Sequence, residues 1–348
     1  MMELPPPQSG PCAWYGPAMA RRSDWIVTLD DRDRAEIAAA LAPLAQADIA
    51  AIAKADFPLP RLGGKLAGVL DDVLNGRGFV LLRGLDVAAL SRREAAMAFY
   101  GIGAHLGHAR SQNAKGHVLG HVQDLGLDVK DPNVRIYQTH ERQTYHTDSC
   151  DIVGLLCLQT AKSGGLSALV SSSTIFNEMR KRRPDLLALL FDPIATDRRG
   201  EVPAGMKPYF EIPVFNWYAG QLSAIYQRQY VDSAQRFADA LRLSARHVEA
   251  LDLFDALAND PALNLHMEFK PGDMQFVHNH TLLHDRTSFE DWAEPAKRRH
   301  LLRLWLAAPG ARPLPAVFAE RYGSVEVGNR GGIILPTTTR LNAPLEAV

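Results

Sequence analysis

Two histidines and one aspartate stand out as candidate metal ligands. His146 and Asp148 form a His-x-Asp pair, and His284 lies far downstream, at the end of Asn279–His284. In an extended strand, residues two apart point to the same side, so this imidazole and this carboxylate can bind one ion together. A distant third imidazole completes one face of an octahedron and leaves three positions open. Such a set suits non-haem Fe(II) oxygenases, whereas structural zinc sites usually close with four ligands.

Strand-like segments border both ligand groups. The apolar run Ile152–Leu158 follows the His-x-Asp pair, and Ser163–Val170 follows that run after a polar break. Before the distant histidine, a Pro-Gly turn leads into a second apolar stretch within Met267–Val277. Apolar runs bounded by turn residues predict strands. We therefore expect both ligand groups to lie beside strands.

With these motifs the chain resembles the Fe(II)/2-oxoglutarate-dependent dioxygenases of the taurine dioxygenase (TauD/TfdA) family, from about residue 78 to residue 309. The resemblance rests on the His-x-Asp pair, the distant histidine, a Gly-Gly-x-Ser segment and an arginine cluster. It implies that His146, Asp148 and His284 bind Fe(II). It also implies that 2-oxoglutarate and O2 are cosubstrates, and that succinate and CO2 are released while a substrate is oxidised.

The resemblance extends to the residues that hold the cosubstrate. Ser167 follows Gly164-Gly165, where the family has a Thr or Ser that contacts the oxoacid, and Arg299 matches the arginine that pairs with its far carboxylate. A guanidinium offers a planar, permanently charged fork, which suits a carboxylate better than a lysine ammonium does. Arg303 follows Arg299 at a spacing like that of one helical turn. It matches a second arginine that faces the cosubstrate or an anionic substrate in some relatives.

Other interpretations of these residues are open. Alone, a His-x-Asp pair is more often a surface or hydrogen-bonded pair, and the arginine cluster is a short basic run. A zinc hydrolase that uses bound hydroxide is one alternative, although it leaves Arg299 unexplained. A non-catalytic metabolite-binding barrel is the other. The remaining histidines considered are interpreted as structural or exposed: His105, His108, His117, His121, His140, His278, His280 and His300.

The substrate is not specified by the sequence. Hydroxylation of a small organic molecule is the expected reaction, and the candidate substrate residues are Gln112, Asn113, Tyr145, Tyr209 and Trp217. Core packing is the alternative interpretation of each aromatic residue. Amides, aromatics and a guanidinium together suit a small, partly apolar acid.

Composition indicates an ordinary enzyme. The chain has 348 residues, 47% of them hydrophobic, and a net charge of -1, so neither nucleic acid nor a membrane is an expected partner. The N-terminus lacks the basic and apolar regions of a secretory signal, so we expect a cytoplasmic location. Cys12, Cys150 and Cys157 do not predict a disulfide scaffold or a thiolate zinc site. The ends of the chain could mediate homo-oligomer formation.

The predicted fold class is mainly β with a helical flank, an α+β arrangement with a double-stranded β-helix (jelly roll, cupin-like) core. We expect an N-terminal arm and helical flank over 1–65, the dioxygenase core over 66–310 and a packed tail over 311–348. An insert over about 176–261 would separate the metal-ligand strands, and residues 192–218 within it are a candidate irregular lid. Helices are expected at 31–54, 66–74, 91–100, 174–191 with a break at Pro184, 227–241 and 244–258.

Overall fold

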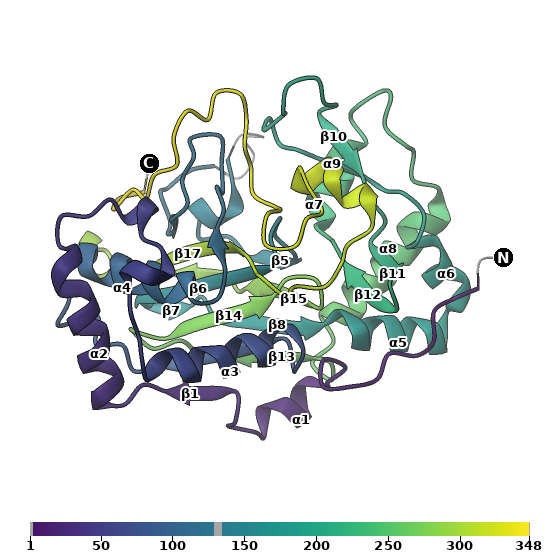
Figure 1. Cartoon of the computed structure of the whole chain (residues 1–348). Helices are drawn as coiled ribbons and strands as arrows, with labels where there is room; N and C mark the ends of the chain where they lie inside the picture. Colours follow the sequence, from purple (N-terminus) through teal and green to yellow (C-terminus); the bar gives the residue numbers. More distant parts are fainter. Residues whose placement is uncertain (1–2, 129–133, 348) are drawn as a thin grey trace.

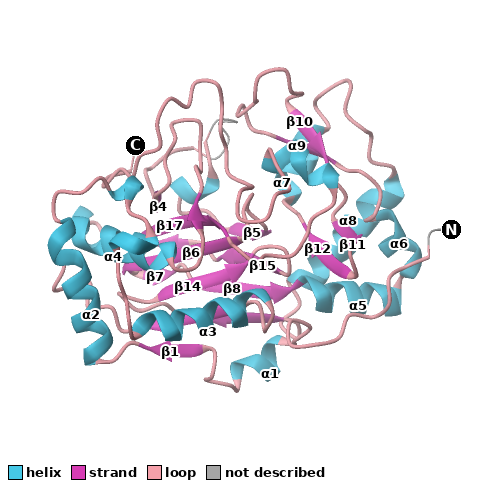
Figure 2. Ribbon diagram, in the orientation of Figure 1, coloured by secondary structure: helices cyan, strands magenta, loops and turns pink. Residues whose placement is uncertain are grey.

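Two β-sheets form the centre of the molecule, and helices flank them (Figure 1, Figure 2). The computed structural model describes residues 3–128 and 134–347. Within these residues, the larger sheet has the strand order β1-β2-β14-β6-β17-β3, and β4 also pairs with β17. Its strands are β1 (Ile26–Thr28), β2 (Phe79–Arg83), β3 (His108–Ala109), β4 (Gly120–Val122), β6 (Ile152–Gln159), β14 (Met274–His278) and β17 (His300–Ala307).

The smaller sheet carries both candidate histidine ligands. Its antiparallel order is β13-β8-β15-β5. The strands are β5 (Gln143–His146), β8 (Ser167–Ser171), β13 (Asn264–Met267) and β15 (Leu282–Arg286). The strands predicted beside the ligand groups are therefore present. Strands β6 and β8, however, belong to different sheets, because the chain crosses from one sheet to the other between them.

The helices form two groups. On the N-terminal side are α1 (Gly16–Ala20), α2 (Asp31–Leu41), α3 (Leu62–Leu74) and α4 (Arg92–Ala104), of which α3 and α4 pack on the larger sheet. Between β8 and β13 lie α5 (Ser172–Arg182), α6 (Pro184–Leu189), α7 (Arg228–Ala234) and α8 (Ala245–Ala258), on the opposite side in Figure 1. A short helix, α9 (Ala319–Tyr322), lies near the C-terminus.

Proline sets two helix boundaries. The sequence predicts one helix over 31–54, but α2 ends at Leu41. Pro43 explains this early end, because proline has no N–H to donate to the preceding turn and its ring clashes with that turn. The break predicted at Pro184 is confirmed, since this residue begins α6. The helix predicted over 227–241 is only partly present, as α7.

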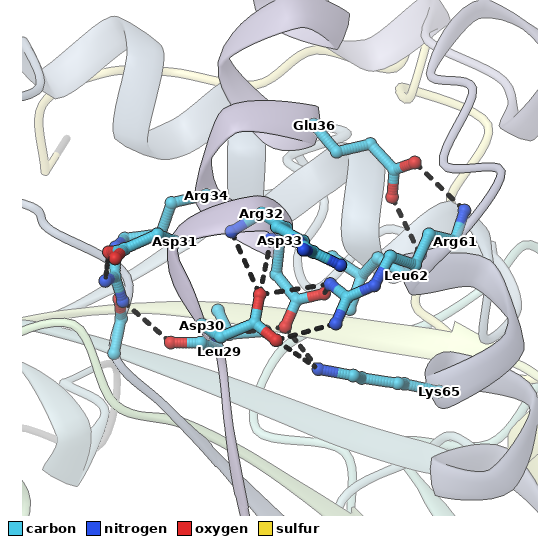
Figure 3. Close-up of polar contacts among 11 residues, drawn as sticks. Leu29, Asp30, Asp31, Arg32, Asp33, Arg34, Glu36, Arg61, Leu62 and Lys65 are labelled. Atoms are coloured by element: carbon cyan, nitrogen blue, oxygen red, sulfur yellow. Dashed lines mark hydrogen bonds and ion pairs between the residues drawn. The ribbon is translucent and has the colours of Figure 1, made fainter.

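A cluster of carboxylates and cations fixes the start of α2 (Figure 3). The Asp30 side chain accepts hydrogen bonds from the backbone N–H groups of Arg32 and Asp33, and the Asp33 carboxylate accepts one from Asp30 N. Arg61 Nη2 lies 2.6 Å from Asp30 Oδ2, and both Arg61 and Lys65 pair with buried Asp33. The capping box contributes on the order of 1 kcal/mol to helix stability, and the ion pairs join α2 to α3.

A capping box fixes the start of α4, close to the beginning of the helix predicted over 91–100. The Ser91 hydroxyl accepts from Glu94 N, and the Glu94 carboxylate accepts from Ser91 N at 2.8 Å. The helix continues past its predicted end to Ala104. Its inner side packs on the larger sheet, where the Phe99 and Phe276 ring centroids lie 6.2 Å apart. This apolar layer holds the larger sheet in place behind the candidate site.

Short strands interrupt the region between β8 and β13. The sequence predicts an irregular segment over 192–218, but this segment contains β9 (Ala195–Asp197), β10 (Tyr209–Glu211) and β11 (Phe215–Tyr218), and β12 (Gln221–Ala224) follows. A further small pair is β7 (Ser163–Gly164) with β16 (Phe289–Glu290). The chain is thus a mixed α/β protein with several sheets. In its described part, no helix is long and apolar enough to cross a bilayer.

Candidate metal centre and adjoining cavities

His146 and His284 face each other across two neighbouring strands. His146 ends β5, and its register partner His284 lies within β15. Asp148 Oδ1 lies 4.0 Å from His146 Nε2, and Asp148 Oδ2 lies 3.7 Å from His284 Nε2. One ligand atom of each residue lies within 4.8 Å of the other two. The structure therefore brings the three predicted ligands together in a group that can hold a metal ion.

The Asp148 carboxylate is positioned by residues from other segments. The two-residue spacing suggested that Asp148 lies on the same strand as His146. Strand β5 ends at His146, however, so Asp148 lies in the following loop. The Asp148 backbone N–H donates to Asn279 Oδ1 at 2.9 Å. Trp305 Nε1 donates to Asp148 Oδ2 at 2.9 Å, and Arg303 Nη1 lies 3.5 Å from the same oxygen. These contacts aim the carboxylate at the histidines.

The protonation states of His146 and Asp148 suit a metal. Burial lowers the pKa of His146 to about 3, which keeps the imidazole neutral at pH 7. His146 Nδ1 lies 2.8 Å from Thr144 O and donates to it, so Nε2 retains its lone pair. Burial alone would raise the pKa of Asp148, but the charge of Arg303 and the contact with His284 outweigh it and lower this pKa. A neutral imidazole and an ionised carboxylate are the forms that bind a metal.

A cavity beside the histidines, called here the inner cavity, contains the predicted cosubstrate residues. Its wall includes Ser167 and Arg299 together with His146 and His284. Most of its remaining wall is Val122, Tyr137, Gln143, Leu155, Phe269, Arg286, Leu301 and Arg303. An oxoacid in this cavity would therefore have the metal centre at one end and guanidinium and hydroxyl donors nearby.

Arg299 is a buried cation whose Nη1 has no hydrogen-bond partner. The residue is 5% exposed, and in the described part of the chain its guanidinium forms no ion pair with a carboxylate. Burial lowers the pKa of Arg299 to about 10, so it is still charged at neutral pH. A Cβ at Gly165 would lie 2.9 Å from Arg299 Nε, so glycine leaves room for the guanidinium. A buried charge with an unused donor fits the far carboxylate of 2-oxoglutarate.

Arg286 is a second cation in the inner cavity and is not among the predicted site residues. It lies two residues after His284 on β15, so the two side chains share one face of the strand. The Arg286 guanidinium donates to the carbonyl oxygens of Thr139 at 3.1 Å and Ile136 at 3.4 Å. It therefore anchors residues 136–139, whose Tyr137 lines the cavity. Its two-residue spacing from the histidine is the signal that could have found it.

A second cavity, called here the outer cavity, lies on the Asp148 side of the metal centre. Its wall includes Asp148 and the flanking residues Thr147 and Ser149. The other lining residues are mostly polar or aromatic: Gln112, Arg135, Tyr137, Gln143, Thr196, Phe210, Ile225, Tyr226, Gln227, Tyr230, Arg303, Trp305 and Arg321. Since three of these residues also line the inner cavity, the two cavities adjoin.

Strand β17 contributes alternate residues to the two cavities. Leu301 lines the inner cavity, Trp305 lines the outer cavity, and Arg303 lines both. The spacing from Arg299 to Arg303 does not correspond to a helical turn. This segment leads into strand β17, where residues two apart share a face. Arg303 Nε donates to Gln112 Oε1 at 2.8 Å, which holds its guanidinium beside the metal centre.

The structure gives most of the predicted substrate residues other surroundings. All five predicted substrate residues lie in the described part of the chain. Among them, Gln112 lines the outer cavity. Tyr145 is buried in the core of the helical region, the Tyr209 hydroxyl donates to a backbone carbonyl at 2.8 Å, and Trp217 is 40% exposed. Asn113 contacts a neighbouring histidine of its own loop. These four side chains are not among the residues that line either cavity.

Several residues that line the outer cavity are not predicted from the sequence. Phe210 lines the outer cavity, whereas the predicted residue is its neighbour Tyr209, whose side chain lies on the other face of β10. Arg135, Tyr230 and Arg321 lie far apart in the sequence and outside any motif. No signal in the sequence alone distinguishes these residues from exposed ones.

The C-terminal segment packs against the loop that carries Asp148. Arg330 is fully buried, and its Nη2 lies 2.7 Å from Asp151 Oδ1. His280 Nε2 lies 2.9 Å from the same oxygen, and the Tyr322 hydroxyl donates to the Asp148 carbonyl at 3.3 Å. His280 thus has structural partners, in agreement with its predicted role.

Comparisons with known proteins agree with this arrangement. Residues 40–305 match the family described as taurine catabolism dioxygenase TauD, TfdA family. The chain is 32% identical over 329 residues to FR-33289 synthase of Streptomyces rubellomurinus, covering 92% of this chain and 96% of that protein. It is 33% identical over 318 residues to the taurine hydroxylase-like protein SAT17 of Stachybotrys chartarum, covering 86% and 81%.

A solved structure supports the fold. Asparagine oxygenase, crystallised with Fe(II), 2S,3S-3-hydroxyasparagine and succinate, superposes with a TM-score of 0.64 at 18% identity and covers 81% of this chain and 93% of its own. Together with the sequence matches, which span most of the chain, this likeness agrees with the geometry of the site. The chain belongs to the TauD/TfdA family of Fe(II)- and 2-oxoglutarate-dependent dioxygenases.

Proposed function

We propose that His146, Asp148 and His284 bind the Fe(II) of this dioxygenase, and that Arg299 and Ser167 hold the far carboxylate of 2-oxoglutarate. One observation carries this assignment: buried Arg299, with an unused donor, lines the same cavity as the two candidate histidine ligands. A zinc hydrolase would have no use for such a cation. The apolar side chains of the inner cavity would exclude water around the cosubstrate.

The roles of the residues follow from their contacts. Bound iron supplies the oxidising chemistry that couples decarboxylation of 2-oxoglutarate to succinate and CO2 with oxidation of a substrate by O2. His146 presents Nε2 because Nδ1 is occupied by Thr144 O. Trp305 and Arg303 hold the Asp148 carboxylate in its ionised form. Arg299 orients the oxoacid, and Arg286 holds residues 136–139 at the cavity wall.

We infer that the outer cavity binds a small organic substrate and that the reaction is a hydroxylation. This cavity contacts Asp148 and adjoins the inner cavity, so a bound molecule would lie next to the metal centre. Asparagine oxygenase, which has the same fold, was crystallised with a hydroxylated amino acid. The substrate of this chain need not be an amino acid, because identity to that enzyme is 18%.

We also propose that the two sheets form the double-stranded β-helix (jelly roll) expected from the sequence. Residues 66–310 would be its core, 1–65 its flank and 311–348 a tail packed on it. The insert over about 176–261 would cover the site, since Thr196, Phe210 and Tyr226 line the outer cavity. Deletion of residues 203–217 is expected to change substrate selectivity and to uncouple succinate release from substrate oxidation. Unchanged selectivity and coupling would contradict this role.

The decisive experiment is an anaerobic titration of the metal-free protein with Fe(II) and then 2-oxoglutarate. The chelate of Fe(II) with an oxoacid has a weak visible charge-transfer band. We expect this band in the parent protein, its loss in His146→Ala, and a requirement for on the order of 10- to 100-fold more oxoacid in Arg299→Ala, because a charge-assisted pair is lost.

Matched controls are available next to both residues. Arg298→Ala removes the adjacent, exposed arginine, and His140→Ala removes an exposed histidine, so both variants are expected to behave like the parent. If folded, iron-loaded parent protein forms no band, the oxoacid assignment fails. Activity restored by zinc would then favour the hydrolase, and binding of a metabolite without turnover would favour the non-catalytic barrel.

A further inference from the structure

The charges around the outer cavity are unevenly paired. Three guanidinium groups line it, those of Arg135, Arg303 and Arg321. Arg303 lies 3.5 Å from the carboxylate of Asp148, and Arg135 forms an ion pair with Glu201. In the described part of the chain, Arg321 has no carboxylate within ion-pair distance. Among these three cations, Arg321 is therefore the one that forms no ion pair.

The Arg321 guanidinium is held in a defined position. Its Nε donates to Ser149 Oγ at 2.6 Å, and the guanidinium lies 5.6 Å from the ring centroid of Phe210. Ser149 directly follows Asp148, so this contact places Arg321 beside the metal-binding loop. Its two terminal nitrogens form no hydrogen bond with any described residue. They remain available as donors at the cavity wall.

We propose that Arg321 binds an oxyanionic group of the substrate and thereby selects an anionic substrate for the outer cavity. This inference rests on the proposed function of the site. A guanidinium presents parallel N–H donors that match the oxygens of a carboxylate, sulfonate, phosphonate or phosphate. Arg135 borders the same cavity and adds positive potential, since Glu201 balances only one charge. An anion at this place would also pair a partly buried cation that has no counter-ion.

Arg321 is partly buried, and its surroundings disfavour its charge. Desolvation lowers the pKa of Arg321, Glu201 raises it and Arg135 lowers it further. The positive charge of the guanidinium is thus disfavoured by its surroundings, and an anionic ligand would relieve this. Arg303, which some relatives use to bind an anion, already contacts Asp148 and Gln112. Arg321 comes from the C-terminal segment, beyond residues 40–305 that match the family.

The test measures binding of simple probes and not turnover. Protein loaded with Fe(II) and saturated with 2-oxoglutarate, without O2, would be titrated calorimetrically with acetate, methanesulfonate, methylphosphonate, inorganic phosphate and neutral acetamide. Saturation keeps the probes away from Arg299. We expect at least one anion to bind more tightly than acetamide, and Arg321→Gln to weaken that anion on the order of 10- to 100-fold. Arg321→Lys should retain part of the affinity.

The matched control is Arg340→Gln, which removes an exposed arginine from the same C-terminal segment and should leave anion affinity unchanged. The charge-transfer band of the chelate shows whether each variant is folded and loaded. If Arg321→Gln does not fold, a loss of affinity in Arg321→Lys but not in Arg340→Lys supports the proposal.

Three outcomes would overturn the proposal: no preference for anions over acetamide, parent-like affinity in Arg321→Gln, or an equal loss in the Arg340 variant. The anion that binds most tightly identifies the substrate class. Failure of the parent to form the chelate band would instead contradict the proposed function itself, so the two failures are distinguishable.

Discussion

His146 and His284 are register partners on adjacent antiparallel strands, with ring centroids 4.1 Å apart. The smaller sheet therefore sets the spacing of two of the three candidate ligands. The third ligand, Asp148, has no strand to fix it and depends on donors from elsewhere. Trp305, on the larger sheet, donates to its carboxylate. The metal centre thus depends on the relative position of both sheets.

Replacing Trp305 with Phe should weaken metal binding. The variant keeps an aromatic ring but loses the N–H that holds Asp148 Oδ2. Loss of such an outer hydrogen bond typically lowers metal affinity about 10- to 100-fold. The Fe(II) dissociation constant, measured anaerobically by competition with a chelator, checks this. Trp217→Phe alters an exposed tryptophan and should bind Fe(II) like the parent, whereas equal affinity of both variants would contradict the role of Trp305.

Asp151→Asn should destabilise the protein strongly. Burial alone would raise the pKa of Asp151, but hydrogen bonds from His280 and the charge of Arg330 lower it, so the native residue is ionised. The amide would leave Arg330 buried without a counter-charge, at a cost of about 3–5 kcal/mol in free energy of unfolding. Urea denaturation measures this change.

The control is an exposed ion pair. Arg340→Ala removes the partner of Asp48 on the surface and should cost less than about 1 kcal/mol. A similar loss in Asp151→Asn and Arg340→Ala would show that the buried network does not hold the C-terminal segment.

Two helical glycines should respond in opposite directions to alanine. A Cβ at Gly101 in α4 would lie 2.4 Å from Phe57 Cγ, so Gly101→Ala should lower the free energy of unfolding by about 1–3 kcal/mol through overpacking. A Cβ at Gly68 in α3 meets nothing within 4 Å, so Gly68→Ala should raise it by about 0.5–1 kcal/mol. Denaturant midpoints of the two variants test this pair. The same sign for both would refute the packing argument.

Stability should fall as the pH is lowered, partly through His300. Burial, followed by the positive potential of His121, Arg92 and Arg299, lowers the pKa of His300 to about 3. The unfolded residue has a pKa of about 6.5, so between these values the unfolded chain binds a proton that the native protein does not. This difference costs about 2 kcal/mol of stability between about pH 7 and about pH 5.

The comparison with His300→Gln isolates this contribution. Urea unfolding at both pH values should show a smaller loss in this variant than in the parent. His140→Gln, which changes an exposed histidine, should lose as much stability as the parent. An unchanged loss in His300→Gln would mean that His300 is protonated in the native state.

Local sequence determines much of the fold and part of the site. The capping boxes at Asp30 and Ser91 and the break at Pro184 depend on backbone groups a few residues away, so they can be read from the chain. The candidate ligands His146 and His284 are recognised by residue type and order. The early end of α2 shows the limit, because the helix predicted over 31–54 runs through Pro43.

Only the tertiary structure decides how the remaining groups converge. Arg135, Trp305 and Arg321 come from segments with no motif in common, and strand pairing and the packing of the C-terminal segment bring them to one cavity. A sequence specifies that a residue is arginine, but whether its charge is compensated depends on which carboxylates lie within a few ångströms. That distance is set by contacts between residues far apart in the chain. For this reason the sequence by itself indicates the metal and the cosubstrate chemistry, whereas only the tertiary structure shows which cation at the outer cavity has no ion-pair partner.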